Sequence, residues 1–381
     1  MEHVERVLAV LRHKEPDRIP IDMGSPINSI HVVAYRNLLR YLGLGDVPLV
    51  IWDRMQQLAE APSVHEAILE MFDVDFRHVR LNPPKLEEVK FISDDMYVNE
   101  FGITFKKAGY YYDMVEHLKL LYNAKSINDI EKYEGPKPHE GRFKGLAEIA
   151  KAYRERGFAV TADAFSGGIY ELALWLRGLA NFFRDLKASP EMAEALLDKT
   201  LEIHKGFWEA YLNEVGDYVH VVLYGDDYGL QTGLQMSPKT WREFIKPRLR
   251  DLVSFVKKQA HVHFMLHSCG SIRAIMDDLV EIGIDIINPL QPRAKDMDRR
   301  ELGWIYGGKI VFHGNVDIQY VLPRGTVEEV EEEVKDVIST LAPYYIFSPA
   351  HNIQADVPPQ NIVAAYRAAQ VHGRLVKMAK R

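Results

Sequence analysis

The sequence predicts an α/β protein whose parallel strands close into a (β/α)8 TIM barrel, and three observations lead to that prediction. Short apolar, β-branched runs alternate with helical patterns about seven times along the chain, which is typical of a parallel sheet. No GxGxxG motif follows the first run, which favours a closed barrel over an open dinucleotide-binding sheet. Polar residues follow most of the runs, where barrel enzymes hold their active sites. We expect residues 1–381 to form a single domain.

The first part of the chain is expected to form a helix, a strand-like stretch and an inserted β unit. Apolar residues recur at helical spacing in residues 2–13, and the segment Glu15–Pro20 ends that helix before the extended stretch IPIDMG. Two helices and a strand are expected next, over residues 30–42, 64–71 and 73–81. Residues 85–123 are rich in aromatic and β-branched residues, which predicts a small β insert. We expect Tyr110, Tyr111 and Tyr112 to pack this insert onto the main body.

The rest of the chain alternates between strands and helices. Ser189 is the expected N-cap of a long helix, and Pro190 suits its first position. The expected strands cover residues 158–165, 217–227, 264–267, 284–290, 309–317 and 344–352. The expected helices cover residues 142–156, 169–186, 190–215, 238–259, 328–342 and 359–377, with a further helical pattern beginning at residue 272.

Composition and charge exclude several classes of protein. A formal net charge of −7 argues against nucleic acid as the main partner, because phosphate binding needs a basic surface. Cys269 is the only cysteine, which rules out an internal disulfide framework and fits a reducing cytosol. The N-terminal residues have no uninterrupted apolar stretch like that of a signal peptide, and no apolar run is long enough for a membrane span. We expect a cytoplasmic protein with no membrane or nucleic-acid partner.

The stretch HVHFMLHSCGS, residues 261–271, contains the first candidate metal ligands. Residues two apart in an extended segment point the same way, so His267 and Cys269 can face one metal ion. An imidazole and a thiolate suit zinc better than they suit hard cations. His351, at the end of the last expected strand, is the candidate third ligand, which would leave an open fourth position as in catalytic zinc sites. In the alternative reading, Cys269 is a small core residue and no metal binds.

Other polar residues at strand ends are candidates for the same barrel mouth. They are Asp22, Asp163, Asp226, Asp227, Asn288, Asn315 and Asp317. Asp226 or Asp227 could supply a fourth metal ligand, or could hold the imidazole ring of a metal-binding histidine in place. For Asp22 the alternative is a turn or cap residue. Glu171 is a candidate acid or base that could equally cap a helix.

Several segments together make the chain resemble the uroporphyrinogen decarboxylase superfamily over nearly its whole length. They are RVLAVLRHKEPDRIPID, GGIYELALWLRG, YGDDYG with MSPKTWREFIKPRL, LHSCGSIRAIMDDLVEIGIDIINPLQP, HGNVD and SPAHNIQADVPPQNIVAAY. The resemblance implies a TIM barrel of the uroporphyrinogen decarboxylase type, which agrees with the alternation of strands and helices.

One chemistry of the superfamily is decarboxylation. Uroporphyrinogen decarboxylases remove acetate carboxyls from a tetrapyrrole without metal or cofactor, and they grip the substrate with an N-terminal RQAGR-type loop. The corresponding stretch here, IDMGSPINSIH, lacks that arginine pair. Because guanidinium groups are the preferred partners of carboxylates, this departure counts against uroporphyrinogen as the substrate.

The other chemistry is methyl transfer by corrinoid-dependent enzymes, including the methylcobamide:coenzyme M methyltransferases. Those enzymes bind zinc through an HxC motif and a cysteine in a PGC-like motif. His267 and Cys269 match HxC, and His351 stands where the cysteine of PGC would be. The resemblance implies Zn²⁺ at these residues and a corrinoid carried by a separate protein, since this chain has no DxHxxG signature. His351 could instead match the GHG histidine of the decarboxylases.

We therefore expect a zinc-dependent methyltransferase that moves a methyl group between a corrinoid protein and a small thiol or methoxy substrate. Catalytic or positioning roles are expected for Asp226 and Asp227, and substrate contacts for Asn288, Asn315 and Asp317. The main alternative is a tetrapyrrole decarboxylase in which Asp22 takes part in the chemistry, and a noncatalytic tetrapyrrole-binding protein is a further one. The aromatic insert could support a homodimer contact.

Overall fold

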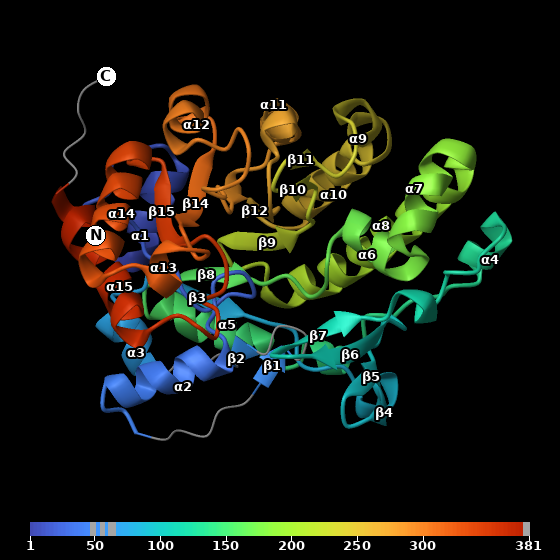
Figure 1. Ribbon diagram of the computed structural model, residues 1–381, viewed down its shortest axis with the longest axis horizontal. Coiled ribbons are helices and arrows are strands. Elements are labelled where there is room, and N and C mark those ends of the chain that lie inside the picture. The colour runs from blue at the N-terminus through green and yellow to red at the C-terminus, as the bar shows by residue number, and fades with distance from the viewer. Residues whose placement is uncertain (46–50, 54–57, 60–65, 376–381) are drawn as a thin grey trace.

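A computed structural model describes residues 1–45, 51–53, 58–59 and 66–375 of the chain (Figure 1). Its main feature is a curled parallel sheet of seven strands in the order β15-β14-β13-β12-β9-β8-β3. The strands are β3 (Phe76–Val79), β8 (Ala159–Ala162), β9 (Val221–Gly225), β12 (His263–His267), β13 (Ile286–Asn288), β14 (Val311–Val316) and β15 (Tyr345–Pro349). The expected α/β fold with a parallel sheet is confirmed, with strands shorter than predicted.

The N-terminal stretch that was expected to begin a strand lies between the two outer strands of this sheet. Ile21 forms a parallel bridge with Phe347 of β15. On the other side, the backbone N–H of Asp75, just before β3, donates to the carbonyl of Ile21 at 2.8 Å. Among the described residues this contact is a bridge and not an eighth strand of the sheet, so full closure into an eight-stranded barrel stays a prediction.

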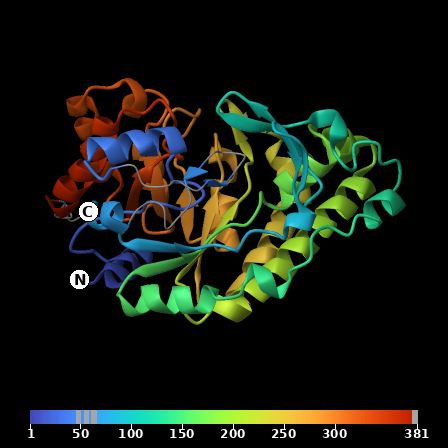
Figure 2. The ribbon, with the colours of Figure 1, turned by 90° about the horizontal axis from the view of Figure 1, so that it is seen from below.

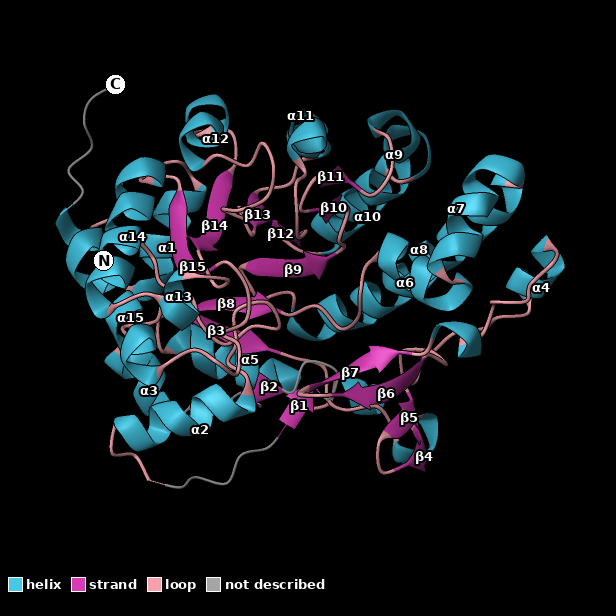
Figure 3. Ribbon diagram, viewed as in Figure 1, coloured by secondary structure: helices cyan, strands magenta, loops and turns pink. Residues whose placement is uncertain are grey.

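Helices cover the outside of the sheet, as Figures 1 and 3 show. The α-helices are α1 (His3–Leu11), α2 (Val32–Tyr41), α3 (Glu66–Met71), α4 (Ile127–Glu131), α5 (Leu146–Glu155), α6 (Ile169–Arg177), α7 (Leu179–Ala188), α8 (Pro190–Val215), α9 (Pro238–Phe244), α10 (Lys246–Gln259), α11 (Met276–Ile282), α12 (Arg299–Tyr306), α13 (Val321–Arg324), α14 (Val327–Leu341) and α15 (Pro359–Leu375). Short 3-10 turns are η1 (Leu86–Glu88), η2 (Glu116–Leu118), η3 (Glu140–Arg142) and η4 (Arg273–Ile275). None of the described helices combines the length and apolar character that a membrane span needs.

Two helices predicted as continuous are interrupted. The expected helix over residues 169–186 divides at Gly178, whose φ of +85° is outside the helical region and is tolerated by glycine. The expected helix over residues 238–259 divides at Ile245, just before Pro247. Proline has no backbone N–H to donate to the preceding turn, so α10 begins with Pro247 in its first positions.

The predicted β insert is an antiparallel sheet to one side of the main sheet (Figure 2). Its strands are β4 (Lys90–Ser93), β5 (Met96–Val98), β6 (Thr104–Ala108) and β7 (Tyr111–Met114), and two small hairpins are β1 (Ile51–Asp53) with β2 (Leu58–Ala59) and β10 (Gly229–Leu230) with β11 (Gly233–Leu234). The Tyr111 hydroxyl donates to Gln354, and the rings of Tyr110 and Tyr111 contact His31. These two tyrosines therefore join the insert to the main body, as predicted.

The interior of the curled sheet is layered. Near the amino ends of the strands, inward residues pack with α1 into one buried apolar cluster that includes Val7, Val10, Phe76, Met265 and Ile286. Because side chains two apart share a face of a strand, the next inward positions point into the same interior. Those positions are polar at His78, His267, Asn288, His313 and Ser348. A polar layer thus lies above an apolar one, toward the carboxyl ends of the strands.

Candidate metal centre

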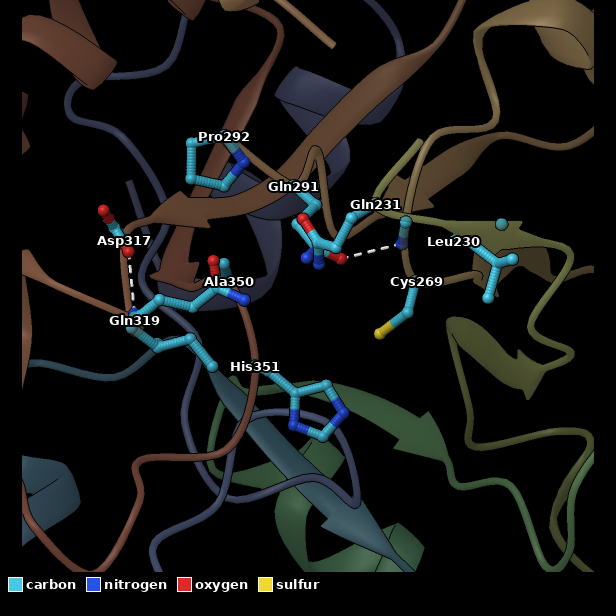
Figure 4. Close-up of a pocket in the computed structure, with 12 residues that line it drawn as sticks. Leu230, Gln231, Cys269, Gln291, Pro292, Asp317, Gln319, Ala350 and His351 are labelled. Atoms are coloured by element: carbon cyan, nitrogen blue, oxygen red, sulfur yellow. Dashed lines mark hydrogen bonds between the residues drawn. The ribbon is translucent and has the colours of Figure 1, made fainter. Parts of the chain in front are cut away.

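Three soft ligands meet at the carboxyl ends of β12 and β15. His267 is the last residue of β12, Cys269 follows in the next loop, and His351 lies just after β15. One ligand atom from each residue lies within 4.8 Å of the other two, and His267 Nε2 is 3.4 Å from Cys269 Sγ. Figure 4 shows the Cys269 and His351 side chains facing a common cavity. The structure therefore brings together the three predicted ligands.

The loop that carries Cys269 is held by backbone and side-chain contacts on both sides. The backbone N–H of Cys269 donates to Asp227 Oδ1 at 2.7 Å, and that of Gly270 donates to Gln291 Oε1 at 2.7 Å. Gly270 has a φ of +81°, and a Cβ there would lie 2.4 Å from the Gly229 carbonyl carbon of the β10–β11 hairpin. Glycine is required at residue 270, because a side chain there would collide with the hairpin backbone.

Hydrogen bonding determines which nitrogen of His267 is free. His267 Nδ1 lies 2.5 Å from Asn288 Oδ1, an atom that only accepts hydrogen bonds, so Nδ1 carries the hydrogen. The neutral ring then has its lone pair on Nε2, the nitrogen next to Cys269 Sγ. This is the arrangement that metal-binding histidines adopt.

The electrostatics of the other two ligands suit a cation between them. Burial, with a contribution from His267, lowers the pKa of His351 to about 3, so its ring is neutral at physiological pH. Burial, together with Asp227 and Glu171, raises the pKa of the Cys269 thiol well above its usual value. A divalent cation at this place would reverse that effect and favour the thiolate.

The donor set fits zinc in both chemistry and spacing. Tetrahedral zinc with nitrogen at ~2.05 Å and sulfur at ~2.3 Å places these two donor atoms about 3.5 Å apart. The distance of 3.4 Å between His267 Nε2 and Cys269 Sγ agrees with that geometry. His351 differs, because its Nδ1 accepts a hydrogen bond from the Asn352 backbone N–H at 2.8 Å. The neutral His351 ring therefore carries its hydrogen on Nε2, and ligation by Nε2 requires the Asn352 contact to open.

A cavity of about 350 Å³ opens beside Cys269 and His351 (Figure 4). Three amide side chains, Gln231, Gln291 and Gln319, contribute to its wall, together with Leu230 and Asp317 among others. No lysine or arginine is among the described residues that line it. Arg293 lies beside this wall, and its Nε is 2.5 Å from Asp317 Oδ2.

The predicted aspartates at the mouth have different surroundings. Asp227 lies beside the three candidate ligands, with its Oδ1 3.7 Å from His267 Nε2. Asp226 is fully buried and accepts hydrogen bonds from the backbone N–H groups of Tyr170 and Glu171 at the start of α6 and from the Tyr224 and Tyr228 hydroxyls. Its place is therefore the N-terminus of α6 and not the cavity wall.

Glu171 lies near Asp227 and the thiol. Burial, with the charges of Asp227 and Asp226, raises the pKa of its carboxyl well above the usual range. These surroundings therefore favour the protonated form of the carboxyl, and the backbone N–H of Glu171 donates to Asp226.

The other predicted residues are distributed between the cavity and the interior. Asp317 lines the cavity, and Asn315 lies two residues before it with φ +81° and its Nδ2 donating to the Leu290 carbonyl. Asn288 is buried between His267 and His313 and does not line the cavity. Asp22 is also buried, and its carboxylate is bonded to His78 and His313 instead of acting as the turn or cap residue of the alternative interpretation.

Two histidines of the polar layer were not among the predicted site residues. His78 lies at the third position of β3 and His313 at the third position of β14. The sequence contained a signal for both, because FRH and VFH each place a histidine two residues after an inward apolar side chain, as MLH does at His267.

Comparisons with known proteins agree with this fold. A family profile described as uroporphyrinogen decarboxylase (URO-D) matches residues 103–372, which is more than half of the chain. The methylcobamide:CoM methyltransferase MtaA of Methanosarcina barkeri is 26% identical over 228 residues, which are 60% of this chain and 63% of that protein. MtaA of Methanosarcina barkeri strain Fusaro is 23% identical over 228 residues, with the same coverage. The match thus spans less than two thirds of these curated relatives.

One solved structure extends the likeness to nearly the whole chain. A methyltransferase from Methanosarcina mazei superposes with a TM-score of 0.68 at 18% identity, and the match covers 97% of this chain and 99% of that one. At this identity the comparison establishes a shared fold.

Proposed function

From the premise that this chain belongs to the uroporphyrinogen decarboxylase family, a family of enzymes, we propose that it is a zinc-dependent methyltransferase. It would move a methyl group between a corrinoid held by a separate protein and a small thiol or methoxy substrate. The observation that carries the proposal is the cluster of His267, Cys269 and His351 beside an open cavity. Segments from both ends of the chain contribute to this interior, so residues 1–381 would act as one domain.

The chemistry of the proposed reaction needs a Lewis acid and a methyl carrier. Zinc bound to the cluster would lower the pKa of a substrate thiol or polarise a methoxy oxygen, while the partner's corrinoid would exchange the methyl group. His267 and Cys269 would hold the metal in the geometry they already have, and His351 would complete the set after its ring leaves Asn352. Three protein ligands leave a fourth position for substrate.

The surrounding residues would bind substrate and accept its proton. We propose that the Asp227 carboxylate would accept the proton that a substrate thiol loses, since it accepts a hydrogen bond from the Cys269 backbone N–H and lies 3.7 Å from His267. The amides of Gln231, Gln291 and Gln319 would position the rest of the substrate in the cavity, with Asp317 at its wall. Asn315 is a further candidate substrate contact, because its buried Oδ1 has no hydrogen-bond partner among the described residues.

The alternative activity, decarboxylation of a tetrapyrrole, has less support from this site. Asp22 would have to contact the substrate, but its side chain is 1% exposed and both carboxylate oxygens are bonded to histidines. The stretch IDMGSPINSIH provides no arginine for substrate carboxylates. A noncatalytic tetrapyrrole-binding protein would not need three converging metal ligands.

Metal content is the measurement that tests the proposal. We expect about one zinc per chain in the purified protein and a loss of most of it in Cys269→Ser and in His351→Ala, because each change removes one of three ligands. His204→Gln is the matched control, since His204 is a buried histidine outside the cluster and is bonded to the Gly167 carbonyl. A wild-type protein that neither contains zinc nor takes it up would overturn the metal mechanism, and decarboxylation would then take first place.

A further inference from the structure

A continuous series of buried hydrogen bonds, here called the polar chain, crosses the interior from His267 to Asp163. Its links are His267 Nδ1 to Asn288 Oδ1 at 2.5 Å, Asn288 Nδ2 to His313 Nδ1 at 2.7 Å, His313 Nε2 to Asp22 Oδ2 at 2.9 Å, His78 Nε2 to Asp22 Oδ1 at 2.8 Å and His78 Nδ1 to Asp163 Oδ1 at 2.9 Å. All six side chains are more than nine-tenths buried. They come from five strands and strand ends and from the N-terminal stretch, so only the tertiary fold brings them together.

The carboxylate of Asp22 determines which group donates in each hydrogen bond between Asp22 and His267. Contacts with His78 and His313 outweigh burial and hold the pKa of Asp22 well below its usual range, so Asp22 is ionised and can only accept. His313 Nε2 must therefore donate to it, and the neutral His313 ring has its lone pair on Nδ1. That lone pair faces Asn288 Nδ2, which can only donate.

The same logic extends through Asn288 to the metal ligand. With its Nδ2 turned to His313, the Asn288 amide has only Oδ1 to present to His267. Oδ1 requires a donor, so the hydrogen of His267 is on Nδ1 and the lone pair is on Nε2. If the amide were reversed, its Nδ2 would face His267, Nε2 would carry the hydrogen, and His267 could not bind a metal through that atom.

We propose that Asp22, acting through His313 and Asn288, is a positioning residue that holds His267 in the tautomer needed for metal binding. The proposal concerns a residue outside the proposed ligand set. Its zinc-affinity measurement rests on the proposed metal centre. Asp22 would contact neither metal nor substrate. Its effect would depend on the fact that a carboxylate only accepts hydrogen bonds. An asparagine at residue 22 has nearly the same shape but can donate as well as accept.

His78 supports the ionised state of Asp22. Both nitrogens of His78 face carboxylate oxygens, one from Asp22 and one from Asp163, and only a doubly protonated ring donates to both. The positive charge thus lies between two negative charges, and Arg80 Nε lies 3.0 Å from the second oxygen of Asp163. Asn28 also donates to Asp22 Oδ2 at 2.9 Å.

The test compares Asp22→Asn with the wild type in two measurements. Zinc affinity, measured by competition with a chromogenic chelator, should fall ~10- to 100-fold, as is usual when a partner of a metal-binding histidine is lost. In metal-free protein labelled with ¹⁵N-histidine, the His267 ring, assigned with His267→Gln, should show Nδ1–H in the wild type and a shift toward Nε2–H in Asp22→Asn. His204→Gln should leave both measurements unchanged, because His204 is buried outside the polar chain.

Each outcome decides the proposal. A wild-type His267 with its hydrogen on Nε2 would overturn it, as would a folded Asp22→Asn protein with wild-type zinc affinity and ring signals. If Asp22→Asn fails to fold, the wild-type spectrum and His313→Phe, which removes both ring nitrogens, decide instead, and the Phe variant should lose zinc affinity to a similar extent. A wild type that binds no zinc but shows Nδ1–H would refute the metal centre and leave the polar chain supported.

Discussion

Replacing His78 with glutamine should remove a large part of the pH dependence of stability on the alkaline side. Burial alone lowers the pKa of His78, but the carboxylates of Asp163 and Asp22 outweigh it and raise the pKa to about 9. In the unfolded chain the same ring titrates near 6.5. Because the folded-state value is the higher one, the stabilisation from His78 is complete below pH 6.5 and is lost as the pH rises through about 9.

The magnitude follows from the size of this shift. A rise from about 6.5 to about 9 corresponds to stabilisation on the order of 3 kcal/mol, since each unit of pKa is worth ~1.4 kcal/mol. The His78 side chain is 4% exposed, so solvent screens these charges little. The effect is large for a protein, because whole domains are stable by only ~5–15 kcal/mol.

The assay is the free energy of unfolding in urea at pH 6.5 and at pH 9.5, for the wild type and for His78→Gln. The wild type should lose on the order of 3 kcal/mol more than the variant between these two values. His204→Gln is the control, because burial lowers the pKa of His204 to about 4 and its titration lies below this range. Parallel losses in wild type and His78→Gln would refute the reasoning and would mean that the buried ring is neutral.

Two further predictions concern α6 and the cavity. Gly168→Ala should destabilise the protein by about 3 kcal/mol in urea unfolding, because the added Cβ would lie 2.3 Å from Asp226 Cγ. Gly206→Ala within α8 is the control and should be neutral or stabilising, since the nearest atom to its Cβ would be 4.0 Å away. Equal effects of the two changes would contradict the packing at the start of α6. In cobalt-loaded protein, 2-mercaptoethanesulfonate should bind no more tightly than 2-mercaptoethanol, because no lysine or arginine is among the described residues that line the cavity and Arg293 beside it is paired with Asp317. Thiolate-to-metal absorbance measures both affinities, and tighter binding of the sulfonate would show that a cationic group reaches the substrate.

Several features of this protein follow from its sequence alone. The alternation of apolar runs and helical patterns predicts a parallel α/β sheet. Aromatic clustering predicts a β insert over residues 85–123, and the strands of that insert lie between residues 90 and 114. His267 and Cys269 are two residues apart at a strand end, so local geometry alone predicts that their side chains point the same way and can face one metal ion. The resemblance to the uroporphyrinogen decarboxylase superfamily is confirmed by the family match. These signals are local in the chain or repeated along it.

The polar contacts of the interior depend on tertiary structure. Register pairs His267 with Asn288 across β12 and β13, and Asp22 meets His313 across 291 residues of sequence. The strand order and register that bring such residues together are set by packing of the whole sheet, and a one-residue shift would turn each side chain to the other face. For the same reason, the sequence could not separate Asp226, which binds the N-terminus of α6, from Asp227, which lies beside the candidate metal ligands.

The sequence by itself thus determined the class of fold, the family and the chemical type of the candidate ligands, because periodicity and short motifs are properties of neighbouring residues. Only the tertiary structure decided that His351 lies beside Cys269 and that Asp22 is buried between two histidines. It also decided which nitrogen of His267 is free, since that depends on an amide from another strand and a carboxylate from the N-terminal stretch. The physical reason is that a buried hydrogen-bond network must be satisfied as a whole, and its members meet only when the sheet has folded.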